Sequence, residues 1–284
     1  MAGSRRRRLL DRVVAALDRD GWQVSVLGTT GPGNATVLAA RAVLAGNEMV
    51  AAAGGDGTIN EVVAGMRESG LPLGVIPMGT ANVLAAEMDL PRRPEAIAAS
   101  FAAGARRPLH LPEIDGAPFL LMAGAGFDGA VVAAVSPGLK RRYGKGAFIL
   151  QGLRRLVTGP AERIVVAIDG VPHMADWVVV TNISRYGGSY RLAPDADAGA
   201  PALTAVVFRD AGRQAMLNHF LHLALGTLDR SPLVDFIPAV TVELSNGRGS
   251  TASLVQVDGD TGGALPRRIT ATNTFIDIIV SPPR

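Results

Sequence analysis

The residues best suited to chemistry form the string Gly-Gly-Asp-Gly-Thr-Ile-Asn-Glu at positions 54–61. A short apolar run at residues 49–53 precedes it, and apolar residues at helical spacing follow it at residues 59–66. Glycine lets the backbone approach a ligand closely. The start of a helix offers unpaired N–H groups and a positive dipole end, which suit phosphate. The string therefore predicts a nucleotide-binding turn made by Gly54, Gly55, Asp56, Gly57, Thr58, Asn60 and Glu61.

Asp56 does not suit a bare anion site, because its carboxylate would repel a phosphate. We expect it to hold a Mg²⁺–phosphate group or a substrate hydroxyl instead. The alternative is a tight strand-to-helix turn in which Asp56 is only a helix cap.

A second small-residue string, Pro-Met-Gly-Thr-Ala-Asn, occupies positions 77–82 and follows an apolar strand at residues 73–76. In open α/β sheets, ligands bind outside the carboxyl ends of the strands. We therefore expect Gly79 and Thr80 to face the same ligand as the first string.

Two further features carry less information by themselves. Thr29 begins the string Thr-Thr-Gly-Pro-Gly-Asn-Ala, which is also compatible with an ordinary turn and N-cap. Asp258-Gly259-Asp260 follows an apolar run at residues 254–257, and these three residues alone would make a good β-turn.

The elements that position these residues differ between the two halves of the chain. Helical spacing at residues 9–17, 36–44, 59–66 and 82–88 alternates with strand patterns at 22–27, 49–53 and 73–76, which predicts a parallel sheet covered by helices. Strand patterns dominate later, at 119–123, 164–168, 177–181, 203–208, 240–244, 254–257 and 275–280, with helices at 146–156 and 213–225. This half predicts a mainly antiparallel β-sandwich. We place the domains at residues 1–110 and 111–284.

Composition excludes several classes of protein. Hydrophobic residues make up 48% of the 284 and charged residues 19%, which predicts a folded core. The lack of cysteine excludes disulfides, Cys-ligated zinc and a thiol nucleophile. A net charge of +3 without a nucleic-acid motif argues against a nucleic-acid partner. No apolar run reaches the roughly 18–20 residues that span a bilayer. We expect a soluble, cytoplasmic protein.

GGDGTINEVVAGM at residues 54–66 and PMGTANVLA at 77–85 together resemble the paired signatures of diacylglycerol kinase catalytic domains, sphingosine-type kinases and bacterial lipid kinases. AGAGFDGAVV at 123–132 and the stretch 182–194 resemble later segments of that family, so the likeness covers nearly the whole chain. It implies a Rossmann-like nucleotide-binding domain and a lipid-binding β-sandwich, with the last segment returning to the first domain. NAD kinases share the first string but usually not the second.

The resemblance also implies an activity. A lipid kinase of this type moves the γ-phosphate of ATP, with Mg²⁺, onto the hydroxyl of diacylglycerol or a similar membrane lipid, as a step of phospholipid biosynthesis. Thr29 would contact the nucleotide. Asp260 would be the general base in place of the family's Glu, and Asp258 would support it or help to hold metal. Contact with the inner membrane face would be peripheral, through basic and apolar surface, and a homodimer is compatible with the family. The basic run at 140–145 fits either a loop that meets phosphate or lipid headgroups or an ordinary solvated charge run.

The sequence departs from the family pattern in two places. Family members begin with a strand that leads into an Asn-Pro-x-Ser-Gly turn, and residues 1–5 resemble only the tail of that turn. The first strand and the Asn-Pro have no counterpart here, which predicts an exposed sheet edge. The Asp-Gly-Leu that binds a structural Mg²⁺ in relatives reads Ala200-Pro201-Ala202 here, so only Asp197 or Asp195 could replace that ligand. These departures keep two alternatives open: a catalytically degenerate nucleotide- or lipid-binding protein, and an NAD kinase.

Overall fold

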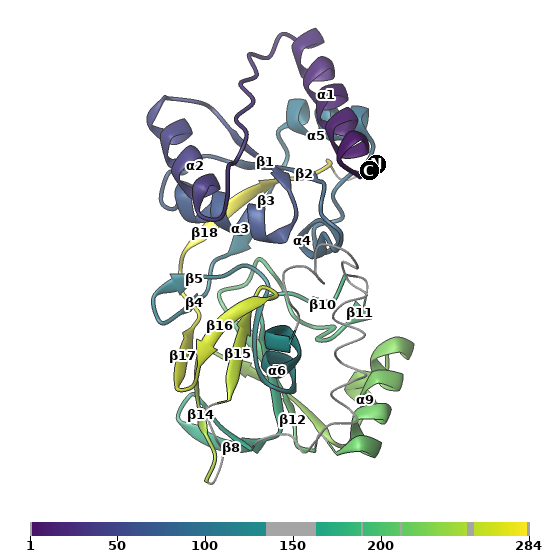
Figure 1. Ribbon diagram of the computed structural model, residues 1–284, viewed down its shortest axis with the longest axis vertical. Coiled ribbons are helices and arrows are strands. Elements are labelled where there is room, and N and C mark those ends of the chain that lie inside the picture. Colours follow the sequence, from purple (N-terminus) through teal and green to yellow (C-terminus); the bar gives the residue numbers. More distant parts are fainter. Residues whose placement is uncertain (1, 135–162, 189, 211, 249–252, 283–284) are drawn as a thin grey trace. The chain divides into compact units, whose positions relative to one another are not determined.

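The computed structural model describes residues 2–134, 163–188, 190–210, 212–248 and 253–282. The chain divides into two compact units (Figure 1). Unit 1 holds residues 1–109 and 275–284, and unit 2 holds residues 110–274. The end of the chain therefore belongs to the same unit as its beginning.

Unit 1 is an α/β unit with helices around a parallel sheet. Its elements are α1 (Ala2–Arg19), α2 (Asn34–Leu44), β1 (Val50–Gly54), α3 (Asp56–Met66), β2 (Leu73–Pro77), α4 (Val83–Glu87), α5 (Pro94–Ala103), β3 (Arg106–His110) and β18 (Phe275–Ile279). Among the described residues the strand order is β1-β2-β18-β3, and both β1 and β18 run parallel to β2. The C-terminal strand β18 thus lies inside the sheet.

The core of unit 1 forms where α1 and α5 pack together on the sheet. Apolar residues recur at helical spacing in both helices, so each presents a continuous apolar face. Val13 and Leu17 of α1 meet Ile97 and Phe101 of α5, and these pack against Ile76 of β2. This packing fixes β2, which carries the second glycine-containing string at its end.

The strand predicted at residues 22–27 does not form. Trp22 and Val24 pack against the α1–α5 core, but Val26 and Leu27 are 53% and 59% exposed. An alternating sequence becomes a strand only where a neighbouring strand completes its hydrogen bonds. In the described part of the chain, β1 is an edge strand whose neighbour is β2.

Unit 2 is built mainly from antiparallel strands. Its elements are β4 (Glu113–Ile114), β5 (Ala117–Pro118), β6 (Met122–Gly126), α6 (Phe127–Ala134), β7 (Ile164–Ile168), β8 (Val171–Ala175), β9 (Trp177–Thr181), β10 (Arg185–Tyr186), β11 (Tyr190–Arg191), β12 (Leu203–Phe208), α9 (Arg213–Leu225), the 3₁₀ turn η1 (Leu228–Arg230), β13 (Val234–Ala239), β14 (Thr241–Asn246), β15 (Leu254–Val257), β16 (Asp260–Ala264) and β17 (Arg267–Thr270).

Within the described residues of unit 2, two large sheets have the orders β13-β12-β9-β6-β15-β16 and β5-β4-β17-β14-β7-β8. Their inward-facing residues alternate along each strand and form one apolar core, which includes Ile164, Val166, Val178, Val180 and Val242. The predicted antiparallel β-sandwich is confirmed. β10 and β11 form a separate small hairpin.

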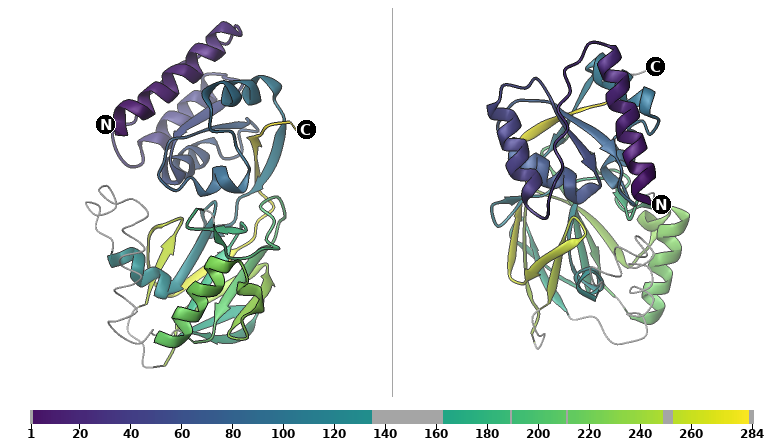
Figure 2. Two further views of the ribbon diagram at one scale, coloured as in Figure 1. Left: turned by 90° about the vertical axis from the view of Figure 1, so that its right-hand side faces the viewer. Right: turned by 45° about the horizontal axis from the view of Figure 1, so that its top comes forward.

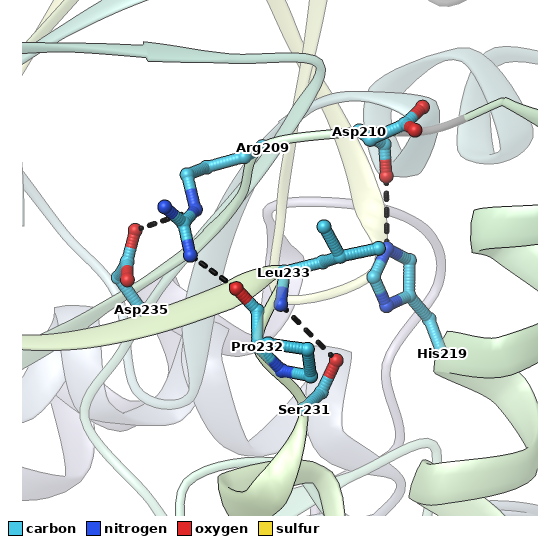
Figure 3. Close-up of polar contacts among 7 residues, drawn as sticks. All are labelled: Arg209, Asp210, His219, Ser231, Pro232, Leu233 and Asp235. Carbon is cyan, nitrogen blue, oxygen red and sulfur yellow. Dashed lines mark hydrogen bonds and ion pairs between the residues drawn. The ribbon is translucent and has the colours of Figure 1, made fainter.

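Helix α9 lies along the outside of the sheet that contains β12 (Figure 2). The ring of His219 meets Phe208 edge-on, with 5.0 Å between the ring centroids. Its Nε2 lies 2.8 Å from the Asp210 carbonyl oxygen (Figure 3). Burial lowers the pKa of His219, so the ring is neutral at pH 7 and Nε2 carries the donated proton. The Arg209 side chain forms an ion pair with Asp235 and donates a hydrogen bond to the Pro232 carbonyl oxygen.

Candidate active site

The two glycine-containing turns of unit 1 meet at the carboxyl ends of β1 and β2. Gly54 lies opposite Pro77 in the parallel register, so both turns begin at the same level of the sheet. The Met78 N–H donates to the Gly54 carbonyl at 2.8 Å. A Cβ added to Gly79 would lie 2.5 Å from the Cα of Gly55. The two backbones touch here: the approach leaves no room for a side chain at Gly79, and a Cβ on Gly55 would lie a tight 3.1 Å from the Gly79 Cα.

Asp56 connects these turns to the next helix. Its Oδ1 accepts a hydrogen bond from the Leu84 N–H at 3.1 Å, in the first turn of α4. The N-cap of its own helix, α3, is Gly55, which makes no side-chain cap hydrogen bond. The half-buried Asp56 side chain therefore caps a neighbouring helix instead of its own, and it stands where the two turns converge.

Asn82 holds the second turn in shape. Its Oδ1 accepts from the Gly79 N–H at 2.7 Å, and its Nδ2 donates to the Gly79 carbonyl at 3.0 Å. The residue has a left-handed φ of 49°, which asparagine tolerates better than most residues. Our prediction from sequence named Gly79 and Thr80 and missed Asn82, although Asn82 stands in the same string.

The other residues of unit 1 that the sequence predicted for the site lie in or near the two glycine-containing turns. Gly57 and Thr80 are exposed, and Thr58 lies under Gly54. Glu61 faces α2, where its Oε2 accepts from the Ala35 N–H at 3.1 Å. Asn60 is half-buried in the first turns of α3.

Thr29 is exposed in the segment before α2. Its neighbour Thr30 donates a backbone hydrogen bond to Asn34 Oδ1 at 3.1 Å. This hydrogen bond ties the segment to α2. Contact of Thr29 with a ligand at the glycine turns stays a prediction.

The Asp258-Gly259-Asp260 string forms the hairpin between β15 and β16 in unit 2. Val257 pairs with Asp260, and the two residues between them have positive φ values of 52° and 83°, the pattern of a type I′ turn. The Asp258 carboxylate accepts hydrogen bonds from the Leu120, Leu121 and Met122 N–H groups at 2.8–3.0 Å. This gives Asp258 a structural role, while Asp260 is exposed at the start of β16.

Asp197, the predicted ligand of a structural metal ion, lies between β11 and β12 in unit 2. Asp197 is exposed, and its Oδ1 accepts from the Gly199 N–H at 2.9 Å within its own turn. Across the described residues, no group of three or more His, Cys, Asp or Glu side chains is placed to hold a metal ion. The role of Asp197 as a metal ligand stays a prediction from the sequence. The basic run at 140–145 and the predicted helix at 146–156 lie outside the described residues.

Asp128 is a polar residue to which the sequence analysis assigned no role. It lies in the first turn of α6 and is only 5% exposed. Its carboxylate accepts hydrogen bonds from the Tyr186 hydroxyl and from Gln256 Nε2. Burial raises its pKa to about 6, against the lowering effect of these two donors. Its signal was an aspartate in the otherwise apolar string AGAGFDGAVV.

Comparison with known proteins identifies the family. Residues 2–114 match the diacylglycerol kinase catalytic domain, and residues 122–280 match the YegS C-terminal NAD kinase beta sandwich-like domain. The chain is 28% identical to a diacylglycerol kinase of Bacillus subtilis (strain 168) over 278 residues, 95% of this chain and 90% of the relative. It is also 28% identical to a diacylglycerol kinase of Staphylococcus carnosus (strain TM300) over 279 residues, 96% of this chain and 89% of the relative.

Solved structures share the fold. A Bacillus anthracis str. Sterne protein superposes with a TM-score of 0.81 at 20% identity, covering 97% of this chain and 90% of that one. A second structure from the same organism, described as a diacylglycerol kinase, gives 0.75 at 20% identity, with 97% and 92% covered. No helix in the described part of the chain is long and apolar enough to cross a bilayer. The chain belongs to the diacylglycerol kinase catalytic-domain family and is a kinase that transfers phosphate to a hydroxyl group.

Proposed function

We propose that this kinase uses ATP to phosphorylate the hydroxyl of diacylglycerol or a similar membrane lipid. The observation that carries the proposal is the contact between the Gly55 and Gly79 turns at the carboxyl ends of two adjacent parallel strands. Ligands of open α/β sheets bind at this edge. The names of the relatives, diacylglycerol kinases, supply the class of acceptor.

The two turns and the start of α3 would hold the phosphates of ATP. Backbone N–H groups at a helix start carry partial positive charge, and glycine leaves room for phosphate to approach them. Mg²⁺ binds in proteins through one or two carboxylates together with substrate phosphates. Asp56 is the carboxylate at this edge and fits that role, since its hydrogen bond to Leu84 occupies only part of its acceptor capacity.

Asp260 is the residue we assign as general base. Phosphoryl transfer depends mainly on positioning and on neutralising charge. As the lipid oxygen attacks the γ-phosphorus, the bond from that phosphorus to the β-phosphate oxygen breaks and ADP leaves. The proton of the lipid hydroxyl must also leave, and the exposed carboxylate of Asp260 would accept it. A short, paired hairpin turn holds this residue more firmly than a long loop would.

Peripheral contact with the membrane fits the surface of α9. Leu217, Leu221 and Leu225 recur every four residues and are 62%, 59% and 68% exposed. Residues at this spacing lie on one face of a helix, and an exposed apolar stripe of this kind suits the boundary between headgroups and acyl chains.

The first experiment measures phosphate transfer from labelled ATP to vesicles that carry diacylglycerol, monoacylglycerol or a sphingoid base, with NAD as a separate acceptor. We expect a labelled lipid and no labelled NADP. Nucleotide binding without transfer to any acceptor would favour the catalytically degenerate alternative, and transfer to NAD alone would favour an NAD kinase.

A glycine variant tests the nucleotide site within the same assay. Gly79→Ala places a Cβ against Gly55, so we expect the KM for ATP to rise at least about tenfold. The matched control is Gly74→Ala in β2, whose Cβ would lie 2.8 Å from the Phe101 ring. The control should lose stability while its KM for ATP stays within about threefold. Equal KM values in the two variants would contradict the assignment of the turns to ATP.

A further inference from the structure

The buried carboxylate of Asp128 lies one side chain away from the Asp258-Gly259-Asp260 turn. Gln256 joins the two: its Nε2 donates to Asp128 Oδ2 at 2.8 Å, and its Oε1 accepts from the Gly259 N–H at 2.8 Å. Gln256 is 3% exposed, and its hydrogen bond to Asp128 is buried, while the one from Gly259 is partly buried. The chain of contacts therefore runs from α6 through β15 to the turn before Asp260.

The chemistry of the two side chains fixes the direction of these hydrogen bonds. An ionised carboxylate only accepts, whereas an amide has one donor end and one acceptor end. Because Asp128 takes the donor end of Gln256, the acceptor end must face Gly259. The Tyr186 hydroxyl donates to the other carboxylate oxygen, so Asp128 has a partner on each side.

Two glycines allow this close arrangement. A Cβ on Gly124 would lie 2.1 Å from Asp128 Oδ2, and a Cβ on Gly129 would lie 1.8 Å from the Leu254 carbonyl oxygen. Helix α6 can therefore pack directly on β6 and β15 with its carboxylate pointing at Gln256. Burying a carboxylate is unfavourable unless it is well hydrogen-bonded, and an apolar side chain would pack here at lower cost.

We infer that Asp128 is a positioning residue: by orienting the Gln256 amide, it fixes the Gly259 turn and thereby the place of the Asp260 carboxylate. This inference rests on the proposed function, because it assigns Asp128 an effect on the residue that accepts the lipid proton. Asp128 acts through Gln256 and the turn, without touching the substrate.

A swap of the two side-chain types tests the inference. Gln256→Glu places two carboxylates against each other, so we expect kcat to fall about 30-fold while the KM for ATP stays within about threefold. Adding Asp128→Asn should restore kcat to within about fivefold of the wild type. The introduced amide can accept from Tyr186 and donate to the introduced carboxylate, whose second oxygen can again accept from Gly259.

A second measurement reports on the conformation of the turn and does not depend on kinase activity. We expect amide hydrogen exchange at Gly259 to be at least about tenfold faster in Gln256→Glu and to return to the wild-type rate in the double variant. Asp169→Asn is the control, since it alters another Asp-Gly turn of unit 2 and should leave both kcat and Gly259 exchange unchanged.

The outcomes separate this inference from the proposed function. If the wild type phosphorylates no lipid, the proposed function fails, and Gly259 exchange alone decides whether Asp128 holds the turn. The inference is overturned if Gln256→Glu keeps both its kcat and its Gly259 protection. It is also overturned if the double variant regains thermal stability but not kcat, since Asp128 and Gln256 would then serve only packing.

Discussion

Two hairpins of unit 2 turn at the same dipeptide, Asp-Gly, in different surroundings. Asp169-Gly170 connects β7 to β8, and Asp258-Gly259 connects β15 to β16. In both, the two turn residues have positive φ values, 47° and 85° in the first and 52° and 83° in the second. Both aspartates also accept backbone N–H groups from a neighbouring segment. The Asp-Gly pair thus specifies the turn in each case.

The surroundings of the two turns differ. Asp169 accepts from Val240 and Thr241 at an exposed corner, whereas Asp258 accepts from three consecutive residues, 120–122, that are almost fully buried. The first turn leads into Val171, and the second leads into Asp260. The Asp-Gly sequence alone therefore does not distinguish the two turns. The second is a candidate catalytic element because of the buried segment that holds it and because Asp260 follows it.

The largest loss of activity should follow from replacing Asp260, the residue after the second turn. Asp260→Asn keeps the side-chain shape but removes the base, so we expect kcat to fall about 1,000-fold, or about 4 kcal/mol in the activation free energy. The midpoint of urea unfolding should stay the same, because Asp260 is exposed. Asp169→Asn, measured beside it, should keep kcat within about twofold. Full lipid phosphorylation by Asp260→Asn would remove Asp260 from the role of base.

Replacing the two turn aspartates should lower the stability of the protein by different amounts. Asp258→Ala leaves three buried N–H groups without an acceptor, and we expect the free energy of unfolding to fall by roughly 3–5 kcal/mol. Asp169→Ala exposes its two N–H groups to water and should cost about 1–2 kcal/mol. Both variants place alanine at a positive φ, so that strain cancels in the comparison. Equal losses in urea unfolding would show that burial does not distinguish the two turns.

Much of the architecture could be predicted because the local signals agree with the tertiary context. β7, β9, β12 and β15 have the predicted bounds, since their apolar runs match buried positions of the sheets. Helix α9 also has the predicted bounds, although Leu217, Leu221 and Leu225 are exposed. The short strands β4, β5, β10 and β11 were missed, because two-residue strands have too few positions to show alternation. The strand expected at residues 22–27 failed because pairing depends on a neighbour, which the segment's own sequence does not reveal.

The candidate site shows the same limit. The glycine strings predicted that two turns would meet, and the contact of Gly55 with Gly79 confirms that geometry. The partners of the carboxylates were not predictable, because they come from distant positions: Leu84 for Asp56, residues 120–122 for Asp258, and Gln256 for Asp128. A motif names the residue types at a site, but only the fold shows which of their hydrogen-bonding groups are already engaged.

The smallest effect concerns the ionisation of Asp128 beneath the second turn. Burial raises its pKa from the ordinary value of 3.8 to about 6, so between these values the folded protein holds a proton that the unfolded chain releases. The free energy of unfolding of the wild type, relative to Asp128→Asn, should therefore rise by about 1 kcal/mol as the pH falls from 7 to 5. His110 and His219, whose pKa values burial lowers, act in the opposite direction but are present in both proteins and cancel. Urea unfolding at pH 7, 6 and 5 measures the difference. If the two proteins keep a constant gap, Asp128 ionises like an exposed carboxylate, and its burial would not distinguish the second turn from the first.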